Sequence, residues 1–299
     1  MIRRMHWDST EKTSGSALLL VLWSIITMSV AVLGVVEYIH YNLDETQGLN
    51  LNFELRQIAQ SGIAVAFSPQ IKEGDPLLKA NMGNDGGRFE VELHSETARL
   101  NINEILQTGN EEVLEKLFLT WKATSSESRM VVQALIRWTE RTGTSSKDYA
   151  LGQEFTSVEQ MREVAEMAKI DKVKPDWAEA FTTWGSGKID VNDATPDILQ
   201  AFFGIGERRA QSFVQSRLGP DNKEHTLDDQ PFTDMKLLAG ALGFTDKQFQ
   251  VYAQSVSLET QLSRAESTAF LGERKRQIRV IFNRKAQPTV IYQWQEVPL

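Results

Sequence analysis

The sequence predicts an α+β protein in which a long N-terminal helix precedes an antiparallel β-sheet interrupted by a large helical insert. Three observations lead to this prediction. A long uncharged run lies near the N-terminus, apolar residues alternate near residue 90 and again toward the C-terminus, and the stretch between has helical periodicity.

The first element is the uncharged run from Ala17 to Val36. A helix needs about 20 apolar residues to cross a hydrocarbon core of about 30 Å. A secretory signal peptide has a shorter apolar region of roughly 7–15 residues and ends in a small-residue cleavage site, which "EYIHYNLDE" does not offer. The run therefore predicts a membrane-spanning helix over 17–36.

Charges on either side of this run predict its orientation. Arg3, Arg4 and Lys12 precede it, whereas acidic residues follow it without a nearby base. Because Lys and Arg stay on the cytoplasmic side, we expect a cytoplasmic N-terminus, a single pass through the membrane and a C-terminal domain on the opposite side. Apolar residues then continue at three- and four-residue steps until Pro69, which predicts one helix over 16–68 despite Gly48.

The sheet is predicted from two separate stretches, 69–104 and 250–299. Phe89, Val91 and Leu93 alternate along one face of a strand, and Leu100 and Ile102 begin the next. Glycine, proline and polar residues predict a loop over 72–87. Three further strands are expected in "FQVYAQSVSLETQ", "RKRQIRVIFNRK" and "PTVIYQWQEV".

The helical insert divides into a first lobe, 105–187, and a second lobe, 188–249. "ARLNINEI" at 98–105 resembles "GKIDVNDA" at 187–194, and "FTSVEQMREVAEM" at 155–167 resembles "FTDMKLLAGALGF" at 232–244. These matches predict two related helical lobes. Chance similarity between short amphipathic segments is the alternative.

Composition excludes several classes of site. The chain has no cysteine, so disulfides and thiolate chemistry are impossible. Its formal charge of −8 argues against broad affinity for nucleic acid or anionic lipid. The four histidines, 6, 40, 94 and 225, are scattered, and no nucleophile or metalloprotease motif is present. We therefore expect a protein that is not an enzyme.

The sharpest local motif is "ILQAFFGIGERRAQSFVQSR" at 198–217. Gly204, Ile205 and Gly206 are predicted to form the tight turn of a helix-hairpin-helix, preceded by Thr195 and Pro196 at the first helix start. Such a hairpin can offer backbone N–H groups to a phosphate, here assisted by three nearby arginines, 208, 209 and 217. The alternative is a compact turn between packed helices, which the neighbouring acidic residues favour because phosphate binding depends on bases.

An acidic loop follows the hairpin. It contains four carboxylates, those of Asp221, Glu224, Asp228 and Asp229. Calcium takes six to eight oxygen ligands, so this loop is a candidate calcium site. The spacing does not match an EF-hand, and an ordinary solvated loop is the alternative; no other cofactor is expected.

The N-terminus resembles a type IV prepilin signal: a short basic leader, then Gly15, then an uninterrupted apolar helix. The resemblance implies that a prepilin peptidase cuts between Gly15 and Ser16 and methylates the new amine. Residues 1–15 would then be a removable leader, and the helix from Ser16 would be kept as the anchor.

"GSALLLVLW", "RLNIN", "ALIRWTE" and "KIDVNDATPDIL" together resemble the K-type minor pseudopilins of the type II secretion system (general secretion pathway protein K) over essentially the whole chain. That family implies a single-pass protein of the inner membrane, whose periplasmic pseudopilin domain carries two inserted SAM-like lobes. Its members often have an acidic D-W-x-D-x-D run, where this chain has Arg137-Trp138-Thr139-Glu140-Arg141-Thr142. This departure weakens the expectation of the family's calcium sites.

Most prepilins have glutamate at the fifth mature position, where this chain has Leu20. That glutamate neutralises the buried amine of the subunit above, which is costly to leave unpaired. The resemblance therefore implies a tip subunit that nucleates pseudopilus assembly with I-type and J-type minor pseudopilins and the major pseudopilin, without nucleic acid. A membrane-anchored DNA receptor using the hairpin, and a minor subunit of a type IV pilus, are the alternatives.

Overall fold

The computed structural model describes residues 13–82, 86–139 and 154–297, with the backbone alone for 13–16 and 43–48. The chain forms two compact units, residues 1–55 and 56–299, and each is described by itself. Helix α1 (Thr13–Ala66) contributes to both units. It is continuous through Gly48, as its periodicity predicts.

In the first unit, α1 exposes its apolar side chains throughout the described part of the uncharged run. The stretch Ala17–Asn42 has a mean hydropathy of 2.5 and is the one candidate membrane span among the described residues. Exposed apolar side chains along a whole helix require lipid or other apolar helices around them. This part of α1 is therefore consistent with a single-pass anchor.

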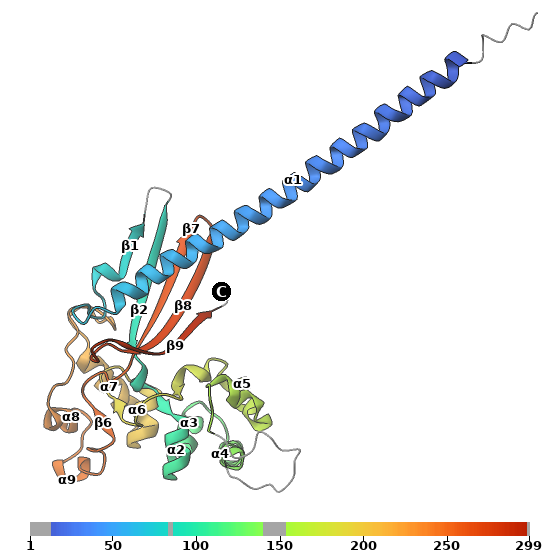
Figure 1. Ribbon diagram of the computed structural model, residues 1–299. Helices are drawn as coiled ribbons and strands as arrows, with labels where there is room; N and C mark the ends of the chain where they lie inside the picture. The colour runs from blue at the N-terminus through green and yellow to red at the C-terminus, as the bar shows by residue number, and fades with distance from the viewer. Residues whose placement is uncertain (1–12, 83–85, 140–153, 298–299) are drawn as a thin grey trace, which may run out of the picture. The chain divides into compact units, whose positions relative to one another are not determined.

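The second unit is built on a five-stranded antiparallel sheet in the order β1-β2-β7-β8-β9. Its strands are β1 (Lys79–Met82), β2 (Gly87–Ser95), β7 (Ser263–Leu271), β8 (Arg274–Asn283) and β9 (Val290–Val297). Figure 1 shows helices α2–α9 gathered beyond the end of the sheet where β2 finishes and β7 begins. The whole insert therefore connects β2 to β7 along the chain, and these two strands pair directly with each other in the sheet.

The observed strands differ from the prediction in four details. The strand that begins at Leu100 is only β3 (Leu100–Asn101), and Ile102 is the first residue of α2 (Ile102–Thr108). The stretch 249–261 contains only the short strand β6 (Val256–Ser257), because Tyr252 packs beside Phe203 and Phe244 with ring centroids 5.1 and 5.5 Å away. The strand of the sheet is instead β7, which alternation does not reveal because it is central and buries polar residues on both faces. The predicted loop 72–87 also contains β1.

The last turns of α1, residues 56–66, pack on one face of this sheet. The buried side chains of Phe89 and Val91, on alternate positions of β2 as predicted, lie under Gly62. A Cβ at Gly62 would lie 2.3 Å from Ser267 Oγ and 2.8 Å from Val91 Cγ2, so only glycine lets the helix backbone rest directly on the sheet.

The insert consists of two helical segments, each closed by a pair of parallel two-residue strands. The first helical segment, residues 100–182, runs from β3 (Leu100–Asn101) to β4 (Phe181–Thr182), and the second, residues 189–257, runs from β5 (Ile189–Asp190) to β6. The first contains α2 (Ile102–Thr108), α3 (Glu112–Thr120), α4 (Ser125–Thr139), η3 (Glu159–Glu163), η4 (Ala165–Met167), α5 (Ala168–Val173) and η5 (Trp177–Ala180). The second contains α6 (Pro196–Phe203), α7 (Glu207–Arg217), α8 (Met235–Ala241) and α9 (Asp246–Phe249), and single turns η1 (Pro76–Leu78) and η2 (Glu96–Ala98) lie outside both.

Both helical segments contain the same asparagine clamp. The Asn103 side chain donates to the carbonyl of Phe155 and accepts from its N–H, at 2.9 and 2.8 Å. At the matching place, Asn192 makes the same two bonds with Phe232, at 2.9 and 2.8 Å. The matched sequence stretches therefore occupy equivalent places in the structure.

The clamped phenylalanines also stack in the same way. Phe155 stacks on Trp138 with centroids 5.7 Å apart, and Phe232 stacks on Phe213 with centroids 4.9 Å apart. The two segments share one hydrophobic core, where α3 packs on α6. Its largest fully buried side chains include Phe118, Phe155, Trp177, Phe181 and Phe213.

Candidate functional sites

The predicted processing site lies in the first turns of α1. The backbone of Gly15 and Ser16 is helical, and residues 1–12 of the predicted leader lie outside the described residues. Leu20, at the predicted fifth mature position, is 71% exposed and presents an apolar side chain on the helix surface. Cleavage between Gly15 and Ser16 stays a prediction.

The predicted hairpin turn joins α6 to α7. Gly204 has φ +63°, a left-handed conformation that favours glycine, and Gly206 caps the N-terminus of α7. Ile205 is buried between them. Thr195 precedes α6 but makes no side-chain capping bond, while Pro196 occupies the first turn.

The three arginines near the hairpin have different environments. Arg208 and Arg209 are exposed. Arg217 is buried and donates to the carbonyls of Val191 and Ala194, at 2.8 and 2.9 Å. The interpretation of Arg217 as a phosphate ligand is therefore wrong, because its guanidinium is buried and bonds to backbone carbonyls within the second helical segment.

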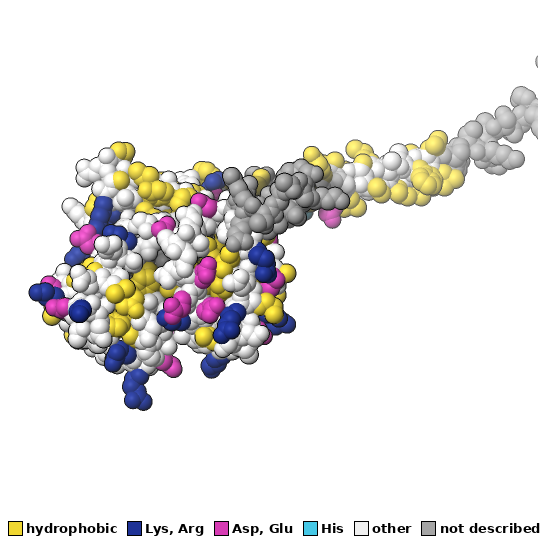
Figure 2. Space-filling model, turned by 90° about the horizontal axis from the view of Figure 1, so that it is seen from below, with side chains coloured by type: hydrophobic (Ala, Val, Ile, Leu, Met, Phe, Trp, Pro, Cys, Tyr) yellow, Lys and Arg dark blue, Asp and Glu magenta, His cyan; other side chains and the backbone are white. Residues whose placement is uncertain are grey.

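Figure 2 shows acidic and basic side chains interspersed over the face of the second unit that it displays. Neutralising a phosphate backbone requires a continuous basic surface. The hairpin thus has the geometry of a helix-hairpin-helix, and the displayed face does not have the charge distribution of a nucleic-acid surface.

The carboxylates of the acidic loop serve mainly as hydrogen-bond acceptors within the loop. Asp228 accepts from the Thr226 hydroxyl at 2.8 Å and from the Asp221 N–H at 3.2 Å, and these bonds lower the pKa of Asp228. Asp229 accepts from the Thr226 N–H at 3.1 Å. Glu224 instead pairs with Arg217 at 3.2 Å. Calcium binding by this loop stays a prediction.

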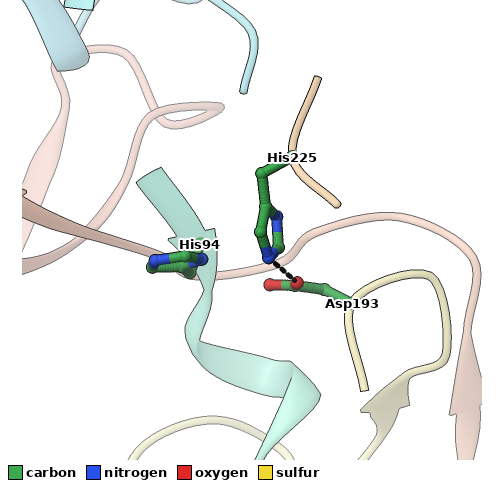
Figure 3. Close-up of side chains that lie close together, drawn as sticks. All are labelled: His94, Asp193 and His225. Carbon is green, nitrogen blue, oxygen red and sulfur yellow. Dashed lines mark ion pairs between the residues drawn. The ribbon is translucent and has the colours of Figure 1, made fainter. Parts of the chain in front are cut away.

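A cluster of two histidines and an aspartate lies where the second helical segment meets the sheet. This His–Asp cluster contains His94 at the end of β2, Asp193 in the turn after β5, and His225 in the loop between α7 and α8. Its ligand atoms all lie within 4.8 Å of one another. Figure 3 shows the His225 ring directed at the Asp193 carboxylate, with the His94 ring beside them.

Each member of the cluster has a defined contact. His225 Nε2 lies 3.5 Å from Asp193 Oδ1, and its Nδ1 lies 3.0 Å from a Glu73 carboxylate oxygen. The other oxygen of Asp193 accepts from the Ser95 N–H at 2.5 Å. The two imidazole rings meet edge to face, with centroids 4.6 Å apart.

Burial and charge shift the pKa of all three groups. Burial lowers the pKa of His94 to about 3, with the positive charge on His225 acting in the same direction. Burial also raises the pKa of Asp193 to about 7, with a further contribution from Glu73. For His225 burial acts downward, but the hydrogen bond to Glu73 and the Asp193 charge outweigh it and raise the pKa to about 9.

The cluster borders a pocket of about 330 Å³. Its polar lining includes Lys72, Glu73, Asp190, Asp193, Arg217 and His225. Sequence reasoning missed this site because His94 and His225 belong to different elements far apart in the chain. No local spacing reports their contact, which depends on how the loop after α7 returns to the sheet.

An ion-pair network lies where the first helical segment meets the sheet. Glu179 pairs with Arg99, with Arg264 at 3.1 Å and with Arg279 at 3.8 Å. Burial disfavours ionisation of Glu179, but the two guanidiniums of Arg99 and Arg264 outweigh it and lower the pKa to about 2. Arg264 also lies 3.2 Å from Glu266 on its own strand.

Comparisons with known proteins identify a structural relative. No protein-family model matches the sequence, and no curated protein matches it. The structure resembles GspK in the crystal structure of the GspK-GspI-GspJ complex from the enterotoxigenic Escherichia coli type 2 secretion system. The TM-score is 0.61 at 14% sequence identity, covering 87% of this chain and 99% of that chain. At this identity the likeness shows a shared pseudopilin-like α+β fold.

Proposed function

We propose that this protein is the tip subunit of a type II secretion pseudopilus, a non-enzymatic minor pseudopilin that nucleates pseudopilus assembly. The observation that carries the proposal is the likeness to GspK over almost the whole of that chain. Because the likeness covers 87% of this chain, it extends beyond the sheet into the helical insert.

The N-terminal helix supports the same assignment. Its exposed apolar surface suits a membrane before assembly and a bundle of apolar helices afterwards. In that bundle the Ser16 amine of the mature chain would pair with a glutamate of a subunit beneath. Leu20 offers no carboxylate to a subunit above, so the chain fits only at the top of the filament.

The size of the second unit also favours a tip position. Residues 56–299 carry two helical segments in addition to the sheet, and such bulk hinders regular stacking along a filament. We assign the segments as the two SAM-like lobes of the K-type family, on the basis of their matching clamps. The partners would be I-type and J-type minor pseudopilins, as in the GspK-GspI-GspJ complex, with the C-terminal domain in the periplasm.

The hairpin leaves a second candidate, a membrane-anchored DNA receptor. Its turn has helix-hairpin-helix geometry, and Arg208 and Arg209 are exposed beside it. The burial of Arg217, and the mixed charges on the face that Figure 2 displays, favour the structural interpretation instead.

Isolation of the full chain from membranes of its own cell, with mass spectrometry of the bound proteins, tests the proposal. We expect other minor pseudopilins to co-purify, and the mature chain to begin at an N-methylated Ser16. Leu20→Glu should lower the yield of the complex modestly, because a central acid costs about 2.5–3.5 kcal/mol in a membrane helix and less near its edge. Leu20→Met, which keeps the volume and polarity, is the control.

Three outcomes would contradict this function. An assembled chain that retains Met1 would rule out prepilin-type processing. A yield of complex that rises with Leu20→Glu would rule out the tip position. Co-purification of pilin subunits in place of pseudopilins would identify a type IV pilus subunit.

A further inference from the structure

We propose that His94, Asp193 and His225 form a binding site for a divalent transition-metal ion of the Zn²⁺ class. The ion would join the end of β2 to two parts of the second helical segment, the turn after β5 and the loop between α7 and α8. This inference is independent of the proposed function, because it rests on side chains of the second unit alone.

The spacing of the ligand atoms is the first argument. Zinc binds imidazole nitrogen and carboxylate oxygen at about 2.0–2.2 Å, which places neighbouring tetrahedral ligands roughly 3.3–3.5 Å apart. His225 Nε2 and Asp193 Oδ1 are 3.5 Å apart, longer than an ordinary hydrogen bond of about 2.7–3.2 Å but suitable for two ligands of one ion. His94 completes the set within 4.8 Å, so a shift of about 1 Å would bring it into coordination.

Outer contacts already orient two of the three ligands, His225 and Asp193. A metal-bound histidine usually donates its other ring N–H to a carboxylate, which directs the free nitrogen toward the ion. Glu73 lies 3.0 Å from His225 Nδ1 and would accept this bond, leaving Nε2 for the ion. The Ser95 N–H holds one oxygen of Asp193 and leaves the other facing His225.

The backbone also holds His225 in place. His225 has φ +59°, a left-handed conformation that is uncommon for a residue with a side chain. A Cβ at Gly74 would lie only 2.6 Å from the His225 carbonyl oxygen, so the two backbones are in close contact. Gly74 thereby lets the loop carrying His225 approach the residue that orients its ring, Glu73.

The surrounding charges and the donor set indicate the class of ion. His225 lies between two carboxylates, 3.0 Å from Glu73 and 3.5 Å from Asp193, and a bound ion would replace the positive charge that its ring carries there. The guanidiniums of Arg264 and Arg99 disfavour positive charge at His94. Two imidazoles favour Zn²⁺, Ni²⁺ or Cu²⁺ over Ca²⁺, which takes oxygen ligands. The adjacent pocket gives an ion and its remaining water ligands access from solvent.

Metal titration of the untagged full chain in detergent, after chelator treatment, tests the site. Zn²⁺ binding is measured by calorimetry, and Co²⁺ binding by the visible absorption that a site of low coordination number gives. We expect one saturable site per chain and a higher thermal unfolding temperature with Zn²⁺. Excess Ca²⁺ should not displace the ion.

Variants separate this site from adventitious binding. His225→Gln and His94→Gln should each abolish saturable binding, and Glu73→Gln should weaken it roughly 10–100-fold. His40→Gln and Asp228→Asn are matched controls outside the cluster and should leave affinity unchanged. Absence of saturable Zn²⁺ or Co²⁺ binding by the unmodified chain would overturn the proposal, whatever the folding of the variants. Binding that persists in the doubly substituted His94→Gln/His225→Gln chain would overturn it equally.

Discussion

The two helical segments have the same internal clamp but are attached to the sheet by different chemistry. In the first segment Glu179 reaches Arg264 and Arg279 through an ion-pair network, and the Glu179 side chain is 53% exposed. In the second segment Asp193 accepts from the Ser95 N–H, and His225 contacts both Asp193 and Glu73.

The comparison shows that the fold requires the internal clamp but does not require one particular chemistry for the contact with the sheet. Each asparagine satisfies the backbone of a phenylalanine inside its own segment, and buried backbone groups need such partners wherever the fold recurs. The contact with the sheet can be made by any compatible pair of groups. The second attachment uses half-buried imidazole and carboxylate groups, so that segment alone gains a candidate ion site among the described residues.

The largest expected effect tests whether the two clamps are equivalent. Asn103→Ala should lower the free energy of unfolding by about 2–4 kcal/mol, because it leaves the buried N–H and C=O of Phe155 without partners. Asn192→Ala should cost less, since Asn192 and Phe232 are less buried and water can replace the lost bonds. Urea denaturation followed by tryptophan fluorescence measures both.

The exposed edge-strand variant Asn81→Ala is the control for the clamps, with an expected change within about 0.5 kcal/mol. If Asn103→Ala changed the free energy of unfolding as little as this control does, the clamp would not stabilise the first segment.

A smaller effect is expected for Arg217, the buried arginine of the second segment. Arg217→Met should cost about 2–3 kcal/mol, because the carbonyls of Val191 and Ala194 lose a charged donor. The exposed Arg208→Met should change stability by less than about 0.5 kcal/mol. The unfolding temperatures of the two variants make the comparison.

The same two arginines bear on the hairpin. Equal stability of Arg217→Met and Arg208→Met would contradict the structural role of Arg217. Salt-sensitive binding of duplex DNA by the unmodified chain, lost in Arg208→Met, would favour the DNA receptor.

The smallest effect concerns the attachment of the first segment and depends on pH. Glu179 has a pKa of about 2, below its ordinary value of 4.5, so its stabilising contribution is fully present above pH 4.5 and is lost as the pH falls toward 2. Glu179→Gln should therefore reduce stability at pH 7 by about 1 kcal/mol or less, since solvent screens this half-exposed carboxylate. The difference from the unmodified chain should vanish near pH 2.

Denaturation at a series of pH values, in the presence of chelator, measures this dependence. Glu163→Gln, which removes an exposed carboxylate elsewhere on the first segment, controls for the change in net charge. A difference between Glu179→Gln and the unmodified chain that stayed constant from pH 7 to pH 2 would show that the ion pairs do not attach this segment.

The sequence by itself determined the features that depend on neighbours along the chain. The uncharged run predicts the long helix, alternation at Phe89, Val91 and Leu93 predicts β2, and the two glycines at 204 and 206 predict the hairpin turn. Each follows from local periodicity or from backbone conformation, which one short segment specifies. The paired stretches containing Asn103 and Asn192 also predict the repetition that the clamps display.

Only the tertiary structure decided which distant residues meet. Strand β7 carries Arg264 and Glu266, whose charges predict exposed positions. Both are buried, because the rest of the molecule covers both faces of this strand. Arg217 resembles a phosphate ligand in sequence, but the carbonyls that it binds come from the turn after β5. The rings of His94 and His225 lie with centroids 4.6 Å apart, and no periodicity encodes a contact between segments so far apart in the chain.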